Sequence, residues 1–560
     1  MINIELKTIG KQLGRSIVQI AKETGLHRNT ITALYHNKAK GISFDTIEKI
    51  CSTYSISISE LMSIQRIQDV GHPERLYRQE GQVVPFTSWS WMSMFNNFPL
   101  KYFRNSGVGP IHAYFRNTQV AVYLSTDSMN SLAEWIWRTY NKKEDLDRLW
   151  KIYLLSADRI EQCYMTHDRS DIISFSYDAL LQFVSVLRDM QKNFWGYSLF
   201  LDVFDAGVDR KQIDRIATLH TLSIEDIATL TSPEQLTFTQ ERLLALLELT
   251  SASFFSKKAR KSFSKAMLEK WMQQNNEFQT FKKQYEYAGS SYAAAHHASD
   301  EEICKELSTY IDDPSLLEKD SAALKNHTRT VRNSIEKILQ KKGLAYNPLS
   351  FFQSLTYWRE HRKKINLMSI QIMYAVLDNL ENVSGINGEY LKYLSMEEIE
   401  GVLKGLVTQS LLEERYNNGI LIVADGKHYK IIEGQEAQAI YVDLEESVSV
   451  AASFSKLSGT TVYGGYAKGK ARIIHTLSDA LKIESGEIIV SPMTRPELIP
   501  FLKKACAIIT DEGGITCHAA IIAREFHIPC IVGLGNATRL IKDGDLIEVR
   551  GHHGTVRILS

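Results

Sequence analysis

Glycine is distributed very unevenly along this 560-residue chain. Residues 1–109 contain eight glycines and residues 459–560 contain twelve, but residues 110–340 contain only three. Glycine-rich phosphate loops need clustered glycines, because the backbone must approach the ligand closely and adopt positive φ angles. The middle of the chain therefore cannot supply a loop of this kind.

Length and composition indicate a soluble protein of several domains. A chain of 560 residues is too long for one hydrophobic core, so we expect three or four domains. Lys plus Arg and Asp plus Glu number 65 each, so the net charge says nothing about partners. The six cysteines form no C-x-x-C pair, and the start "MINIELKTIG" has no apolar stretch typical of a signal peptide. No apolar run reaches the roughly 18–20 residues of a membrane span, so we expect a cytoplasmic protein without a membrane partner.

The middle of the chain is expected to be mostly α-helical. In "SPEQLTFTQERLLALLELT", the arrangement of Ser232, Pro233 and Gln235 is typical of an N-cap, N1 and N3, which predicts a helix from Pro233. The pair His296-His297 is expected at the surface.

The pattern changes twice near the carboxyl end. "GILIVADGKHYKII", within residues 418–433, consists of two β-rich runs around Asp425-Gly426 and predicts a β-hairpin. After about residue 456, short β-branched runs alternate with brief helices and glycine turns, which predicts an α/β domain. The predicted segments are 1–66, 67–330, 331–455 and 456–560.

The amino-terminal segment "SIVQIAKETGLHRNTITALYHNKAKGISFDTIEKICSTYSISISELM" predicts three or four short helices with tight turns. Gly25 permits a turn, and Ile31 and Leu34 face inward at helical spacing. The first 65 residues hold eight Lys or Arg and five Asp or Glu, a difference of +3 that is compatible with nucleic acid binding.

This segment resembles the Cro/C1-type helix-turn-helix. The resemblance implies that a helix from about His27 to Tyr35 enters the major groove of DNA, probably the most direct route to base edges for a helix. Ile17 departs from the family, which commonly has a glutamine at this position as a backbone contact. A helical packing module that no longer binds DNA is the alternative, and useful DNA specificity would need a homodimer. The residues implied in DNA binding are His27, Arg28, Asn29 and Thr32.

The stretch "TDEGGITCHAAIIAREFHIPCIVG", residues 510–533, places a histidine at the start of a helix. Gly513-Gly514 allows a sharp turn after the strand "ACAIITD", and Thr516 is the expected N-cap of the helix "HAAIIAREF". His518 then lies in the first turn, where unpaired N–H groups and the positive helix end stabilise an anion and keep the ring neutral. A histidine that accepts and passes on a phosphoryl group has these requirements. The alternative is a structural histidine, and no other histidine has metal-ligand spacing relative to it, so we expect no metal site.

The same stretch resembles the swivelling phosphohistidine domain of the PEP-utilising enzymes, such as phosphoenolpyruvate synthase and rifampicin phosphotransferase. The similarity runs from about Gly459 to the end. It implies that His518 is the phosphorylated histidine, that Thr516 orients the phosphate, and that Arg524 is a charge partner or helix brace. Cys517 stands where the family usually has serine, either as a tolerated small residue or as a weaker hydrogen-bond donor open to oxidation. The matching residues are Thr510, Gly513, Gly514, Thr516, His518, Ala519, Ala520, Arg524, Glu525, Pro529 and Gly533.

The modules that supply phosphate in the resembling enzymes are not found. Residues 71–340 show no ATP-grasp pattern, and no PEP-binding barrel follows the phosphohistidine segment. We therefore expect no bound cofactor beyond the phosphoryl group on His518, with any magnesium held through a partner. Residues 330–440 are weakly similar to a helical acceptor-binding region, although solvated helix faces with charge pairs are the alternative. The residues concerned are Arg359, Glu360, Arg362 and Glu398.

Two functions agree with these patterns. The first is a DNA-binding regulator that a separate nucleotide- or PEP-binding protein phosphorylates on His518. The second is a phosphotransferase component that passes the phosphoryl group to a small molecule bound in the helical middle. The fold prediction is common to both: an all-α amino-terminal helix-turn-helix, a mostly α-helical middle and an α/β phosphohistidine domain.

Overall fold

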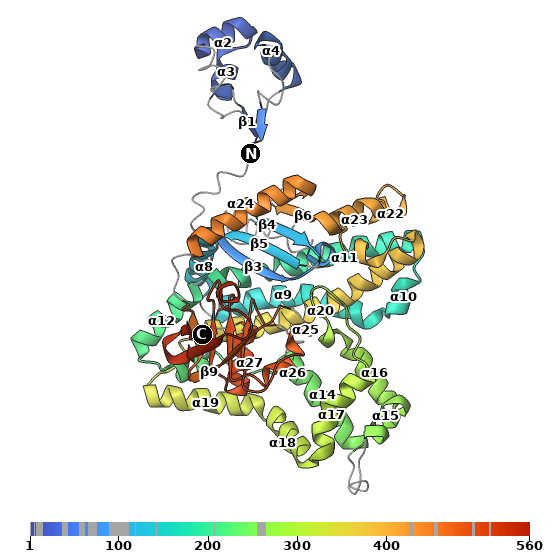
Figure 1. The fold of residues 1–560 in the computed structure, drawn as a ribbon, viewed down its shortest axis with the longest axis vertical. Coiled ribbons are helices and arrows are strands. Elements are labelled where there is room, and N and C mark those ends of the chain that lie inside the picture. Colours follow the sequence, from blue (N-terminus) through green and yellow to red (C-terminus); the bar gives the residue numbers. More distant parts are fainter. Residues whose placement is uncertain are drawn as a thin grey trace. The chain divides into compact units, whose positions relative to one another are not determined.

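The computed structural model divides into two compact units, Met1–Pro73 and Glu74–Ser560, which we describe separately (Figure 1). The described residues are 2–4, 6, 15–35, 43–54, 62–64, 76–88, 111–117, 119–141, 143–206, 208–254, 265–424, 429–452, 457–475, 477–494, 499–514 and 517–559.

The first unit is a small helical domain. It contains α2 (Ile17–Thr24), α3 (Arg28–Tyr35) and α4 (Phe44–Tyr54), and the strands β1 (Ile2–Ile4) and β2 (Met62–Ile64) pair antiparallel. Ser16 and Gln19 form a capping box at the start of α2, and Gly25 ends that helix with φ +66°. The predicted turn is thus confirmed, because Gly25 adopts a left-handed conformation without the steric cost of a side chain. The buried core consists of Leu6, Ile20, Ile31, Leu34, Ile47 and Ile50.

The second unit contains a five-stranded antiparallel sheet that joins distant parts of the sequence. Strand β4 pairs with its neighbour in the sequence, β5, and also with β6, so residues on both sides of the expected boundary at 330/331 share one sheet. The strands β6 and β7 confirm the predicted hairpin, whose central residues Asp425 and Gly426 lie outside the described part. In sheet order the strands are β3 (Leu76–Gln82), β5 (Gln119–Ser125), β4 (Ile111–Arg116), β6 (Ile420–Ala424) and β7 (Tyr429–Glu433).

Alternation along the strands gives this sheet two buried faces. Ile111, Ala113 and Phe115 of β4 belong to the large core formed with the helices. Tyr114, which points the other way, stacks on Tyr441 of α24 (Gly434–Ala452) with ring centroids 4.2 Å apart (Figure 1). The sheet therefore separates α24 from the remaining helices.

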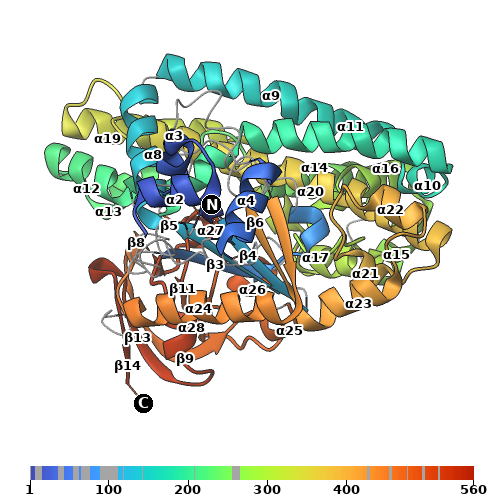
Figure 2. The same cartoon turned by 90° about the horizontal axis from the view of Figure 1, so that it is seen from above.

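A helical module of residues 126–419 fills the sequence between β5 and β6. Helices α9 and α11 run side by side, and Tyr153 of α9 contacts both Phe194 of α11 and Trp358 of α20 (Figure 2). The described helices are α8 (Thr126–Tyr140), α9 (Lys143–Thr166), α10 (Arg169–Ile173), α11 (Tyr177–Gly196), η3 (Leu199–Ala206), α12 (Val208–His220), α13 (Ile224–Leu230), α14 (Phe238–Ser253), α15 (Lys265–Gln274), α16 (Asn276–Gln284), η4 (Glu286–Gly289), α17 (Asp300–Asp312), α18 (Pro314–Lys325), α19 (His327–Lys342), α20 (Ser350–Ser384), α21 (Gly388–Leu391), α22 (Ile399–Leu403) and α23 (Gln409–Asn418).

The predicted start of α14 was wrong. The helix begins at Phe238 rather than Pro233, with Thr237 as N-cap and Gln240 at N3 in a complete capping box. The sequence contains two such signals in succession, and the second lies directly before the apolar run that the helix buries.

Residues 457–559 form the C-terminal domain, whose seven-stranded mixed sheet has the order β14-β13-β9-β10-β11-β12-β8. The central strands β9, β10, β11 and β12 are parallel, which confirms the predicted α/β class. Its elements are β8 (Thr460–Tyr463), β9 (Tyr466–Ile473), α25 (Leu477–Ala480), β10 (Ile488–Ser491), α26 (Ile499–Leu502), β11 (Ala507–Thr510), α27 (His518–Phe526), β12 (Cys530–Val532), α28 (Ala537–Leu540), β13 (Leu546–Arg550), η6 (Gly551–His553) and β14 (Thr555–Ile558).

Candidate functional site

The candidate site lies where β11 ends and the chain turns into α27. Gly513 has φ +101°, a conformation that side-chain-bearing residues rarely adopt. The turn is held by a neighbouring loop, because the N–H of Leu534 donates to the Thr510 carbonyl (3.1 Å) and that of Gly535 to the Asp511 carbonyl (2.8 Å). The site thus occupies the carboxyl end of a parallel strand, a usual place for ligands in α/β sheets.

Helix α27 begins at His518, with Cys517 as its N-cap. The prediction that Thr516 is the N-cap was wrong, since the helix starts one residue later than expected; Thr516 itself lies outside the described residues. Cys517 has extended backbone angles but makes no side-chain cap hydrogen bond. No side-chain cap therefore competes with an anion for the first backbone N–H groups of α27.

Arg524 lies inside the C-terminal domain, close to two thiols. Burial lowers the pKa of Arg524 to about 10, and the nearby Cys517 and Cys530 act in the opposite direction. Burial also raises the pKa of the Cys530 thiol. Of the two roles that the resemblance implies for Arg524, these contacts favour a brace that links the start of α27 to β12.

The helical module contacts this segment at both of its ends. At Gly514, an added Cβ would lie 2.0 Å from Oδ2 of Asp209, which stands in the first turn of α12. At the other end of α27, Nε2 of Gln240 donates to Oε1 of Glu525 (2.8 Å). Burial, together with the nearby Glu360 carboxyl, raises the pKa of Glu525 to about 7. Sequence reasoning missed Asp209 and Gln240, because nothing local to either residue signals a contact some 300 positions away.

The charged residues of α20 and α22 are structural in this fold. Arg359 and Glu360 are only 9% and 4% exposed, so the alternative of solvated helix faces was wrong for both. Arg362 forms two hydrogen bonds with Asp202 (2.9 and 2.6 Å). Glu398 binds Arg415 in the same bidentate manner (2.9 and 2.7 Å). The structure brings Glu360 toward the site, through Glu525.

The predicted DNA-binding residues gather at the start of α3. His27, Arg28 and Asn29 are exposed, whereas Thr32 is half-buried. The N–H of Asn29 donates to Nδ1 of His27 (3.2 Å), and the Thr32 hydroxyl donates to the Arg28 carbonyl (2.8 Å). The side chains of Arg28 and Asn29 are therefore the best placed to reach DNA.

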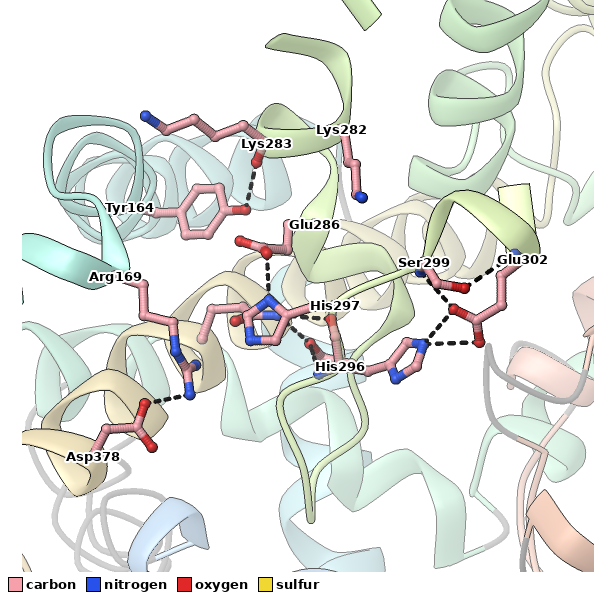
Figure 3. A network of polar contacts seen from close by, with 12 residues as sticks. Tyr164, Arg169, Lys282, Lys283, Glu286, His296, His297, Ser299, Glu302 and Asp378 are labelled. Atoms are coloured by element: carbon pink, nitrogen blue, oxygen red, sulfur yellow. Dashed lines mark hydrogen bonds and ion pairs between the residues drawn. The ribbon is translucent and has the colours of Figure 1, made fainter. Parts of the chain in front are cut away.

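A separate polar network surrounds the exposed pair His296 and His297 (Figure 3). Nε2 of His296 lies 3.1 Å from each carboxylate oxygen of Glu302, and Nδ1 of His297 contacts Glu286. These pairs confirm the expected surface position. Within the described ranges, no three or more His, Cys, Asp or Glu side chains are grouped to hold a metal ion. None of the helices searched, again among described residues, is long and apolar enough to cross a membrane.

Comparisons with known proteins match the two ends of the chain. The family described as "PEP-utilising enzyme, mobile domain" matches residues 483–554, and the "Cro/C1-type HTH DNA-binding domain" matches residues 6–66. The probable phosphoenolpyruvate synthase of Methanothermobacter thermautotrophicus is 48% identical over 92 residues, which cover 16% of this chain and 14% of that protein. The corresponding protein of Archaeoglobus fulgidus is 38% identical over 172 residues, covering 30% of this chain and 22% of that protein.

The chain thus spans less than a quarter of the length of these relatives. Among solved structures, the solution structure of the Enzyme I (nEIt) protein matches with 15% identity and a TM-score of 0.17, over 53% of this chain and 81% of that one. This score is too low to support a conclusion. Residues 6–66 of the chain are a Cro/C1-type helix-turn-helix domain, and residues 483–554 are a mobile domain of the PEP-utilising enzyme type.

Proposed function

We propose that the protein is a DNA-binding transcriptional regulator whose C-terminal domain is phosphorylated on His518 by a donor protein. The observation that carries this proposal is the presence in one chain of both domains in usable form. Helix α3 exposes Arg28 and Asn29 at its start, and α27 begins at His518 directly after a glycine turn. The DNA-bound form is a homodimer in this proposal, because one recognition helix reads too few bases for useful specificity.

The phosphoryl transfer follows from the position of His518 at a helix start. A ring nitrogen attacks the phosphorus of a phosphoanhydride or enol phosphate held by the donor protein. Its lone pair forms the P–N bond, the electrons of the donor P–O bond leave with the donor oxygen, and the surplus ring proton passes to solvent. The positive end of α27 stabilises the transferred charge. Any magnesium ion that the transfer needs arrives with the donor.

Labelling and DNA binding test the two halves of this proposal. Incubation with labelled ATP or PEP in cell extract should give acid-labile phosphorylation of the purified chain. The chain should also bind a pool of genomic DNA fragments with an affinity that falls steeply as salt increases. Weak binding that does not depend on salt would contradict the regulatory role, and absence of acid-labile label would contradict the phosphohistidine.

A phosphotransferase component is the second candidate, supported by the contact between α27 and the helical module. In this role, His518 passes its phosphoryl group to a small molecule held near Asp209, Gln240 and Glu360. The expected result is that labelled protein loses its phosphate when a pool of small metabolites is added. Label that decays at the same rate with and without the pool would contradict this role and leave the regulator.

A further inference from the structure

Helix α27 faces the helical module with the side on which residue 518 is placed. Positions 518 and 525 are seven residues apart, or nearly two turns, so they lie on one face of the helix. Glu525 on this face accepts the hydrogen bond from Gln240 in the first turn of α14. The described state is therefore a docked one, in which the phosphohistidine face of the domain is turned toward the helical module.

Asp209 packs against the turn that precedes this helix. Gly514 does not have a positive φ angle, so its backbone conformation does not require glycine. What requires glycine is space, because an added Cβ would lie 2.0 Å from Oδ2 and 3.0 Å from Cγ of Asp209. Asp209 is only 2% exposed. The glycine turn thus accommodates a buried carboxylate from the helical module, four residues before His518.

The surfaces in contact carry several carboxyl groups and few available cations. We call Asp209, Gln240 and Glu360 the docking face of the helical module. Burial raises the pKa of Glu360, and the same holds for Glu241 beside the docking face. The nearby cations are Lys363, close to Glu360; Lys364, paired with Glu161 (3.1 Å) and Glu241 (3.9 Å); and Lys503, close to Glu525 and lying over the Phe526 ring.

We propose that a phosphoryl group on His518 releases the C-terminal domain from the docking face. The proposal rests on the proposed phosphorylation of His518. A phosphoryl group adds about −1.5 to −2 charges at pH 7. In the docked state this charge would lie on the face of α27 turned toward buried carboxyl groups, where like charges repel strongly because little water screens them. The unphosphorylated domain binds the docking face, whereas the phosphorylated domain is free to meet a partner.

The test compares two variants of the full chain that differ by one charge. His518→Glu supplies a negative charge, and His518→Gln is its neutral counterpart of nearly the same size. Hydrogen exchange is measured at the first-turn amides of α12, residues 208–211, which have no intrahelical acceptor and depend on docking for protection. We expect exchange about tenfold faster in His518→Glu than in His518→Gln, which corresponds to a tenfold shift of the docking equilibrium. His553→Glu, on the exposed η6 segment, is the control and should leave these amides unchanged.

A second substitution identifies the repelling group. Asp209→Asn removes the carboxylate charge while keeping the side-chain shape, so in the His518→Glu background it should restore most of the protection. Equal exchange in His518→Glu and His518→Gln, or an increase that Asp209→Asn does not reduce, would overturn the proposal. These variants need no phosphoryl donor. A chain that takes up no label but responds to the charge would contradict the proposed function alone, and a labelled chain without the response would contradict only the release.

Discussion

Two helices of this chain begin beside a histidine, and they differ in how their first N–H groups are satisfied. At α3, Nδ1 of His27 accepts the N–H of Asn29, so the histidine caps its own helix. At α27, the N-cap is Cys517, which supplies no side-chain cap. A helix start that is capped from within presents its side chains to a ligand, whereas one without a side-chain cap presents backbone N–H groups to an anion. This difference agrees with DNA reading by α3 and phosphoryl binding at α27.

Replacing each histidine tests this comparison most directly. His518→Ala should abolish the acid-labile label, because the attacking nitrogen is lost, whereas His27→Ala should be labelled like the unchanged protein. The measurement is the labelled phosphate retained per chain after alkaline and after acid treatment. Undiminished label in His518→Ala would mean that another residue carries the phosphate, and the distinction between the two helices would fail.

The DNA-binding side of the comparison depends on Arg28. Arg28→Ala should weaken DNA binding by about 5- to 100-fold, the effect of losing one good contact to a base or phosphate. Lys49→Ala is the control, because Lys49 is on α4 and already forms an ion pair with Asp45 (2.9 Å). Titration of both variants with genomic DNA fragments at two salt concentrations measures the effect. Equal losses would indicate a diffuse charge effect in place of recognition by α3.

The two turns that lead into these helices should differ in their tolerance of a side chain. Gly25→Ala should destabilise the first unit by about 1 kcal/mol, since φ +66° is left-handed but no atom lies within 4 Å of the added Cβ. Gly513→Ala should cost the second unit about 3 kcal/mol, because its φ of +101° is less favourable and the Cβ would lie 2.7 Å from Sγ of Cys517. Calorimetric unfolding of each full-length variant checks this order. A smaller loss at Gly513 would show that this turn adapts.

The pH dependence of docking gives the smallest expected effect. Glu525 has a pKa of about 7 in the docked state, above the ordinary value of 4.5, so docking favours its protonated form. Its contribution is fully present below about pH 4.5 and is lost as the pH rises through about 7. Exchange at residues 208–211, corrected for the intrinsic effect of pH, should accelerate across this range and should do so less in Glu525→Gln. The same pH dependence in both proteins would assign the effect to another group.

Short-range features of the fold were predictable from the sequence. Gly25 as a helix end, the inward positions of Ile31 and Leu34, and the hairpin at β6 and β7 all follow from local pattern. The strands β4 and β5 were missed, although "IHAYFRNTQVAVYLS" contains two β-rich runs around Asn117, a hairpin signal. The glycine-poor composition of the surrounding helices concealed them.

The site was predictable only in its local part. The motif placed His518 at a helix start, but it misplaced the cap by one residue, since Thr516 and Cys517 are both small and polar enough to precede a helix. The docking face was not predictable. Asp209 and Gln240 meet Gly514 and Glu525 only through the tertiary arrangement of α12, α14 and the C-terminal domain.

The pairing of β4 with β6 affects how the protein is made. Phe115 and its partner Ile420 are 305 positions apart, so at about 5–20 residues per second a ribosome needs roughly 15–60 s to deliver the second strand. During this interval the open edge of β4 can pair with strands of other nascent chains. Synthesis in the cell therefore requires that emerging helices or a chaperone cover this edge until β6 has left the ribosome.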